Sequence, residues 1–293
     1  MARIFRFLIV MGLAGLAAFY VVTIPRGVDE SRFVGLTGDA TRGATVFHAS
    51  GCASCHTEPT AEFSTGPVLA GGQSFPSDFG TFLAPNISPS VEHGIGDWSL
   101  PEFANAVQRG VSPDGKHYFP VFPYTAYAKM TEQDIADLKA FMDTLPVSEV
   151  ASQPHQVGFP FNIRRSLGGW KLLFANSGWV LEDADTPELI RGRYLVEAQA
   201  HCAECHTPRN ALGGLDTAAW MAGAFLPGEG EVPGITPEKL DWAPEDVAYY
   251  LETGFTPDFD SAGGPMTHVV ENMAQLTPED RDAIAAYLQA LAQ

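Results

Sequence analysis

The chain has 293 residues, with 35 acidic against 17 basic side chains and a formal net charge of −18 at pH 7. This balance excludes binding to nucleic acid or to anionic membrane surfaces through charge. It favours partners with a basic surface, because complementary charge speeds the encounter of two proteins. The generic acidic surface of an exported protein would give the same balance. The length allows one large domain or two of ordinary size.

The N-terminus begins with a segment typical of a membrane anchor. Two arginines precede an uncharged run from Phe7 to Ile24, whose 18 residues (24 − 7 + 1) are enough to cross a bilayer. A cleaved signal peptide looks similar, but it has a shorter apolar core and a small-residue cleavage site, and no convincing A-x-A site is present. We therefore predict an uncleaved anchor over residues 1–26. Because positive charge stays cytoplasmic, the remainder is expected on the periplasmic side of the bacterial inner membrane.

All four cysteines of the chain fall in two similar pentads. These are CASCH (Cys52, Cys55, His56) and CAECH (Cys202, Cys205, His206). In c-type haem attachment, two thiols at this spacing form thioethers to the vinyl groups, and the adjoining histidine binds the iron. A four-cysteine zinc site or two redox dithiols would also use CxxC pairs, but neither needs the histidine. We predict two covalently bound haems c, with His56 and His206 as proximal ligands.

An internal repeat divides the rest of the chain into two units. In each unit a helix-like stretch with Arg-Gly precedes the pentad, a helix led by tryptophan follows it, and a helix capped by threonine closes the unit. In the first unit these sequences are DATRGATVFHASG, WSLPEFANAVQRG and TEQDIADLKAFMDTL. In the second unit they are TPELIRGRYLVEAQAH, WAPEDVAYYLETG and TPEDRDAIAAYLQAL. The last pair has apolar residues at i, i+3, i+4 and i+7 behind a threonine N-cap, which is typical of an amphipathic helix.

The repeat predicts an all-α fold of two tandem domains, residues 34–148 and 185–293, with long loops wrapped around each haem. Gly43 and Gly192 would let the first helix of each unit cross closely over the last; as merely tolerated helix glycines they would cost about 1 kcal/mol each. Residues 149–184 are rich in proline, glycine and aromatic residues, which favours an ordered connector with one short helix. The large aromatic side chains of this connector are expected to bury the domain interface (Trp170, Phe174 and Trp179).

The stretch STGPVLAGG after the first pentad resembles the Gly-Pro-x-Leu-x-Gly signature of class I cytochromes c. The resemblance implies two class I domains. It also implies that the carbonyl of Pro67 accepts a hydrogen bond from the imidazole of His56, which orients the ring and raises its basicity. An ordinary turn proline is the alternative.

Several longer motifs, in one order, resemble the multihaem cytochrome c subunits of membrane-bound alcohol, sorbitol and gluconate dehydrogenases. The motifs are APNISPSVEHGIGDWS, GKHYFPVFPYTAYAKMT, FPFNIRRSLGGWKLLF, RGRYLVEAQAHCAECHTPRNALGG and GGPMTHVVENMAQLTPEDRDAIAAYL. The chain departs from that pattern in two ways. Those subunits carry three haem units, whereas this chain has two, and the methionine of the usual YPAMPY motif is Phe122 here.

The sixth ligand of the second haem is predicted from this resemblance. Met266, in the glycine-rich loop GGPMTHVV and 11 residues before Thr277 (277 − 266), matches the methionine of the family. Met273 is the nearby rival, although it is expected to pack as a flexible core residue.

The sixth ligand of the first haem is a harder case. Met266 lies 24 residues after Trp242, and the residue 24 positions after Trp98 is Phe122 (98 + 24), which cannot bind iron. We predict that the loop is re-routed so that Met130 binds the first haem while Phe122 packs against the haem edge. The alternatives are that Met130 is a core residue at the helix start, or that His117, expected to be solvated in a polar turn, binds instead.

Three further side chains are candidates for contacts with the haem propionates. Trp98 and Trp242 could donate hydrogen bonds from their indoles, whereas a tryptophan at a helix start is also common in a core. Arg209, directly after the second pentad, could pair with a propionate or lie exposed on the surface.

These features predict an electron carrier that is not an enzyme by itself. A haem held by histidine and methionine is coordinatively saturated, so it exchanges electrons and offers no substrate site. We expect transfer from a periplasmic dehydrogenase to an oxidase, to quinone or to a soluble cytochrome. The alternative is a haem enzyme that uses an open position at the first haem to handle peroxide or another small molecule.

Overall fold

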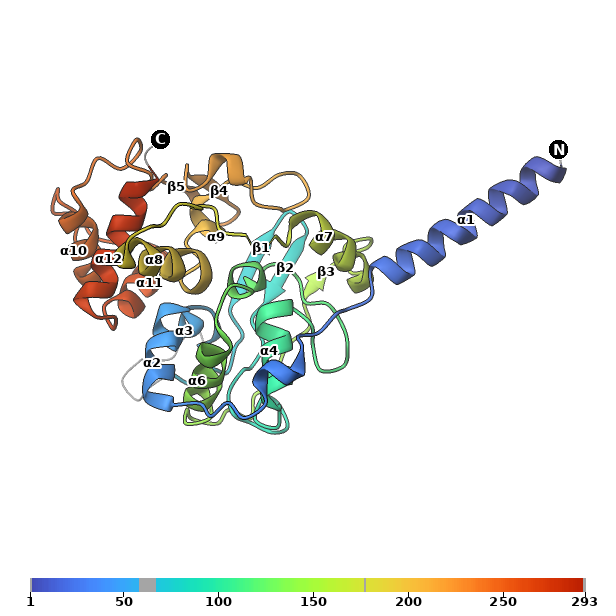
Figure 1. The fold of residues 1–293 in the computed structure, drawn as a ribbon, viewed down its shortest axis with the longest axis horizontal. Helices are drawn as coiled ribbons and strands as arrows, with labels where there is room; N and C mark the ends of the chain where they lie inside the picture. The colour runs from blue at the N-terminus through green and yellow to red at the C-terminus, as the bar shows by residue number, and fades with distance from the viewer. Residues whose placement is uncertain (1, 58–66, 177, 292–293) are drawn as a thin grey trace.

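The computed structural model describes residues 2–57, 67–176 and 178–291. Helix α1 (Ala2–Val22) projects away from a body of two lobes, one built by the first half of the chain and the other by the second half (Figure 1). A short coil and η1 (Glu30–Phe33) connect α1 to the first lobe. The separation of α1 from the body leaves its apolar side chains exposed, and its length and composition suit a membrane anchor or a signal segment.

The first domain is built from helices, several of which begin at side-chain caps. They are α2 (Ala40–Ala49), α3 (Cys52–His56), α4 (Leu100–Arg109), α5 (Tyr124–Tyr127) and α6 (Glu132–Met142). Ser99 and Glu102 form a capping box at α4, and Thr131 caps α6 by accepting a hydrogen bond from the Asp134 amide at 3.1 Å. The threonine cap predicted from the sequence is confirmed.

The second domain repeats this order with one difference before the pentad. Its helices are α8 (Pro187–Tyr194), η4 (Leu195–Gln199), α9 (Ala203–His206), η5 (Thr217–Ala219), α10 (Pro244–Thr253), α11 (Met266–Met273) and α12 (Pro278–Ala290). Whereas α2 is regular, η4 is a turn of π-helix that continues α8. Thr277 caps α12 as Thr131 caps α6.

In each domain the first helix crosses the last at a glycine, as predicted. A methyl group on Gly43 would lie 1.9 Å from the Asp137 carbonyl of α6, and one on Gly192 would lie 2.0 Å from the Ala283 carbonyl of α12. No side chain other than glycine allows this approach. The two crossings place α3 and α9 in equivalent positions of their domains.

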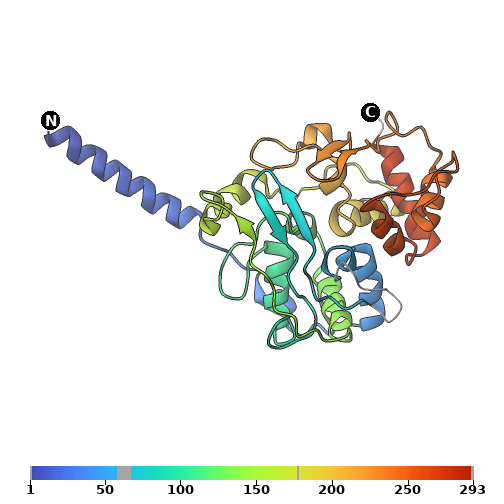
Figure 2. The same cartoon turned by 180° about the vertical axis from the view of Figure 1, so that it is seen from behind.

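The all-α prediction is wrong in one respect, because the described residues include two small antiparallel sheets. They are β1 (Ser74–Ser77), β2 (Gly80–Leu83) and β3 (Gln156–Val157) in one, and β4 (Ala224–Leu226) with β5 (Gly230–Val232) in the other. Both hairpins follow a pentad, and hydrophobic periodicity reveals little about strands this short. The tip of the β1–β2 hairpin points toward the second domain (Figure 2), where Phe79 lies against Gly213.

The connector is ordered and packs on both domains. It supplies β3, η3 (Arg164–Ser166) and α7 (Leu167–Phe174). The Trp170 ring contacts Tyr124 of the first domain with the ring centroids 6.4 Å apart, and its indole N–H donates to the Leu212 carbonyl of the second domain at 2.9 Å. The connector aromatics therefore lie at the domain interface, as expected.

The two hydrophobic cores interlock at the interface. Ala198 of η4 is packed into the core of the first domain, and Ala49 of α2 into the core of the second. The contacts between elements are also reciprocal, since α5 packs against η4 while α11 packs against α2 and α3. Each domain therefore uses related elements to contact the other.

Candidate haem-binding sites

The imidazoles of the two pentads are held in the same way. Nδ1 of His56 lies 2.8 Å from the Pro85 carbonyl oxygen, and Nδ1 of His206 lies 2.7 Å from the Pro233 carbonyl oxygen. A carbonyl can only accept, so Nδ1 carries the proton in both rings. The lone pair of Nε2 is thereby left for a metal, and the bond fixes the ring orientation.

The acceptor for His56 is Pro85 and not Pro67, which corrects the prediction. The hairpin β1–β2 intervenes between the two prolines and returns the chain to the pentad, so that the proline just after β2 reaches Nδ1. The hairpin β4–β5 delivers Pro233 in the same manner. The loop that follows Pro67 contacts the pentad differently, through the Gly71 amide, which donates to the His56 carbonyl at 2.7 Å.

Burial sets the protonation of both histidines and cysteines. It lowers the pKa of His56 and of His206, which keeps the imidazoles neutral and able to bind a metal. It raises the pKa of the Cys52 and Cys202 thiols to about 12. Thiols in the closed fold are therefore protonated and weak nucleophiles, so thioether formation is easier while the chain is still open.

These donor sets fit haem c. Cys52 packs against the core of the first domain and Cys202 against that of the second, so a porphyrin attached to either would meet apolar side chains. When bound, a haem supplies one-electron redox chemistry, while the protein tunes its potential. Within the residues that the structure describes, no group of three or more His, Cys, Asp or Glu side chains is arranged to hold a bare metal ion.

In the first domain, Met130 is buried in the core at 4% exposure. It directly precedes the cap Thr131, and Leu276, also 4% exposed, directly precedes the cap Thr277 of the second domain. The Met130 carbonyl accepts a hydrogen bond from the Gln108 amide at 2.8 Å. The position is thus one that a core residue can fill, and ligation of the iron by Met130 stays a prediction.

His117 is directed away from the solvent, which corrects the expectation of a solvated ring. It is 3% exposed, and its Nε2 lies 3.0 Å from the Thr23 carbonyl oxygen at the end of α1. Its imidazole therefore contacts the end of α1 through this backbone carbonyl. Phe122 is partly buried, and its ring contacts those of Tyr118, Tyr124 and Tyr127.

In the second domain, Met266 is the first residue of α11 and is partly buried against the core. Met273, at the other end of α11, is 3% exposed and belongs to the core itself. The packing role expected for Met273 is consistent with this burial, and ligation by Met266 stays a prediction.

The candidates for propionate contacts already have contacts within the protein. Trp98 and Trp242 are partly buried against the cores of their domains. The Arg209 guanidinium forms an ion pair with Glu204 inside the second pentad and donates to the Gly213 carbonyl at 2.8 Å. Their roles toward a haem stay predictions.

The two pentads lie next to each other. Burial and then the neighbouring Cys205 raise the pKa of Cys55 to about 11, so the thiols of the two pentads interact electrostatically. Tyr127 of the first domain and His201, which directly precedes Cys202, have ring centroids 5.5 Å apart in an edge-on contact. The domains thus bring both haem-attachment sites to their shared interface.

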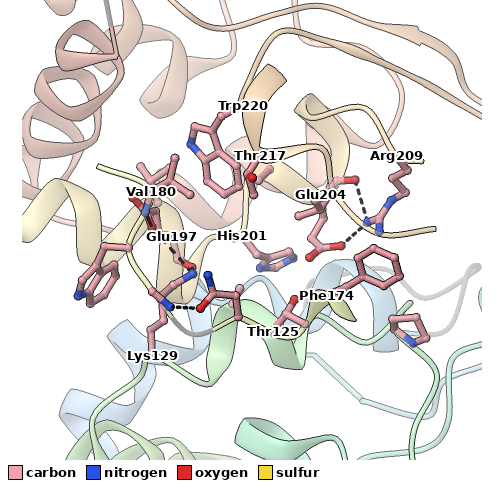
Figure 3. A pocket seen from close by; sticks show the side chains of 18 of the residues that line it. Thr125, Lys129, Phe174, Val180, Glu197, His201, Glu204, Arg209, Thr217 and Trp220 are labelled. Atoms are coloured by element: carbon pink, nitrogen blue, oxygen red, sulfur yellow. Dashed lines mark hydrogen bonds and ion pairs between the residues drawn. The ribbon is translucent and has the colours of Figure 1, made fainter. Parts of the chain in front are cut away.

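Sequence reasoning missed the polar groups at this interface. Lys129 and Glu197 line a cavity of about 320 Å³ between the domains, and Figure 3 shows the Lys129 side chain directed toward Glu197 near His201. The available signal was a difference in spacing: Gly192 and Cys202 are ten positions apart (202 − 192), whereas Gly43 and Cys52 are nine apart (52 − 43).

Comparison with known proteins agrees with the two sites. A family model described as "Cytochrome c" matches residues 40–146 and 190–292, each of which contains one pentad. A "Diheme cytochrome c-type" protein of Cereibacter sphaeroides is 54% identical over 278 residues, covering 94% of each chain. The fructose dehydrogenase cytochrome subunit of Gluconobacter japonicus is 38% identical, covering 85% of this chain and 52% of its own.

The alcohol dehydrogenase (quinone) cytochrome c subunit of Gluconobacter oxydans is 31% identical and is covered over 54% of its length, against 85% of this chain. The chain therefore spans about half the length of these two dehydrogenase subunits. By the family model and by the similarity along nearly the whole chain, this protein belongs to the cytochrome c family.

Proposed function

We propose that the chain is a membrane-anchored dihaem cytochrome c that carries electrons from a periplasmic dehydrogenase to a respiratory acceptor. The observation that carries this proposal is the pair of adjoining sites. In each, a neutral imidazole is fixed by a proline carbonyl with Nε2 free for iron. Two such sites side by side suit the passage of single electrons. The relatives named as dehydrogenase cytochrome subunits support a dehydrogenase as donor.

The proposal includes methionine as the sixth ligand of both haems, Met130 in the first domain and Met266 in the second. Met130 has support from its burial in the core and from the engagement of the rival His117 with Thr23. Two coordinatively saturated haems would exchange electrons and exclude substrate. The comparisons do not favour the alternative of a haem enzyme.

The proposal also keeps α1 as a permanent anchor. The helix has a mean hydropathy of 2.1, and its end is bound specifically to the folded domain. The Arg165 guanidinium donates to the Thr23 hydroxyl at 3.0 Å and to the Tyr20 carbonyl at 2.6 Å, and Gly168 lies against Thr23. A segment removed as a signal peptide would have no need of such contacts. Arginines at the start of α1 support a periplasmic body.

The test uses the full chain solubilised in detergent from its native membrane. Proteins that co-purify should include a dehydrogenase, and addition of the substrate of that enzyme should reduce both haems, as followed by absorption. Carbon monoxide and peroxide should react slowly with both haems. Rapid consumption of peroxide at one haem, with no dehydrogenase able to reduce either, would contradict the relay and support an enzyme.

A further inference from the structure

The second half of the repeat has one extra residue immediately before its pentad, and η4 absorbs it as a turn of π-helix. Such turns are rare, and they are frequent at functional sites. The equivalent stretch of the first domain is the regular end of α2. The extra residue therefore gives the second domain a different backbone, and a different set of side chains facing the first domain, at this position.

The π-helical turn carries Glu197, whose carboxylate is enclosed at 1% exposure. The carboxylate accepts hydrogen bonds from the Val180 amide at 2.8 Å, the Leu181 amide at 3.0 Å and the Tyr287 hydroxyl at 2.8 Å. One side chain thus joins the connector to the last helix of the second domain.

The first domain supplies the counter-charge. Nζ of Lys129 lies 3.9 Å from Oε2 of Glu197 and 3.5 Å from its backbone carbonyl oxygen, and the lysine side chain is 7% exposed. The ammonium also lies over the ring of Trp179, 5.7 Å from its centroid. Removal of one partner would leave the other as an uncompensated buried charge, so the pair ties the two domains together.

Two further contacts flank this ion pair. On one side is the edge-on contact between Tyr127 and His201. On the other side, the Asp134 carboxylate accepts hydrogen bonds from the Tyr194 hydroxyl and, at 3.4 Å, from the Gln199 amide. Residues 127–134 of the first domain therefore face residues 194–201 of the second, and together these two segments form the interdomain junction.

We propose that the interdomain junction is a positioning device that holds the two haem-attachment sites at a fixed separation and thereby sets the rate of electron exchange between the haems. The segment 194–201 leads directly into Cys202, and the segment 127–134 contains Met130. In the exchange, one electron leaves the reduced haem of one domain and reduces the oxidised haem of the other, and no bond is broken. The inference rests on the proposed function and adds Lys129 and Glu197 as its positioning residues.

The experiment measures exchange inside the full-length dihaem protein in detergent. A short pulse delivers one electron per molecule, and absorption follows its redistribution between the haems. We expect Lys129→Met and Glu197→Gln each to slow redistribution about tenfold or more, since small displacements of reacting centres cost rate steeply. The absorption spectrum of each haem should stay unchanged. Pulsed EPR of the oxidised protein should show a broader distribution of haem–haem separations in both variants.

Lys139→Met is the matched control. Lys139 is also a largely buried lysine of the first domain, but its partner Asp143 is the C-cap residue of the same helix, so this ion pair does not connect the domains. The variant should therefore exchange electrons at the wild-type rate. Wild-type rates and separations in the Lys129 and Glu197 variants would overturn the proposal. If Lys129→Met yields no haem-loaded protein, the isosteric Glu197→Gln decides alone.

The measurement uses neither dehydrogenase nor acceptor, so the two proposals fail separately. A wild-type protein that exchanges electrons internally but is reduced by no dehydrogenase would reject the relay alone. Variants that exchange at the normal rate and are reduced normally would reject the positioning role alone.

Discussion

Gly43 lies directly against the backbone carbonyl of Asp137, because α2 and α6 cross at this point. The side chain of Asp137 secures the same crossing from the other direction. Its carboxylate accepts from the Asp39 amide at 2.7 Å and from the Arg42 guanidinium at 2.7 Å. The crossing therefore holds the helix that leads into the first pentad.

Gly43→Ala is expected to lower the free energy of unfolding by about 2 kcal/mol or more, since overpacking at a site with no room to relax typically costs this much. Chemical denaturation followed by haem absorption measures the change. Gly192→Ala should have a similar effect in the second domain. Gly169→Ala is the control, because a methyl group there would meet no atom within 4 Å, and it should leave stability unchanged or slightly higher.

Met266→Leu is expected to abolish the methionine-to-iron charge-transfer absorption of one haem and to lower its reduction potential, because methionine ligation raises the potential. Met273→Leu is the matched control on the same helix, at a core position. Loss of the band in the Met273 variant, with the Met266 variant unaffected, would show that the assignment is wrong.

Met130→Leu is expected to convert one haem to high spin and lower its potential, while preserving the fold, since leucine fills the equivalent core position at Leu276. Absorption and EPR spectra measure the spin state. His117→Ala should leave the spin state unchanged, because its ring is bonded to Thr23. A normal spectrum in the Met130 variant would remove this methionine as a ligand.

Lys171 is expected to make stability depend on pH. Burial, with the nearby Arg109 and Arg164, lowers the pKa of Lys171 to about 7 from 10.5. Between these values the unfolded chain binds more protons than the folded one. The free energy of unfolding therefore increases as pH rises from about 7 to about 10.5 and decreases as pH falls through the same window. Below about pH 7 the contribution is constant.

The measurement is the free energy of unfolding of wild type and of Lys171→Met across this window. The free energy of unfolding of the wild type, minus that of the variant, should increase as pH rises. The neighbouring Leu172, which is exposed and has no titratable group, provides the control variant Leu172→Met, which should show a constant difference. An equally constant difference for Lys171→Met would contradict the prediction.

Phe259 is expected to reduce the stability of its loop. It has a φ of 64° and is 94% exposed, and it occupies the position that Gly115, with a φ of 74°, holds in the first domain. A bulky residue in this region is a steric outlier, whereas asparagine tolerates it. Phe259→Asn should therefore raise the free energy of unfolding by about 1 kcal/mol, measured by denaturation. A decrease would show that the phenyl ring stabilises the fold.

The sequence was sufficient for features whose cause is local. The pentads follow from the chemistry of thioether attachment, and Thr131 and Thr277 cap their helices because a short polar side chain can reach the third amide. The crossing glycines were visible because the repeat places them at corresponding positions.

The features that were missed depend on contacts between distant segments. Pro85 replaces Pro67 as the acceptor because a hairpin of short strands, with no clear periodicity, carries it back to His56. From the local sequence alone, Lys129 and Glu197 would be interpreted as surface charges. Only the packing of the two domains encloses them. Local patterns contain no information on such partners.

The reciprocal packing of α5 on η4 and of α11 on α2 and α3 is the arrangement found in a symmetric dimer, where both subunits present the same surface. Cys55 and Cys205 are corresponding residues of the repeat, and Cys205 lies close enough to raise the pKa of the Cys55 thiol. The chain is thus organised like a homodimer joined into one polypeptide, with Lys129 and Gln275 now different at corresponding positions. Fusion makes the association independent of protein concentration, so the two sites remain paired even when the molecule is scarce.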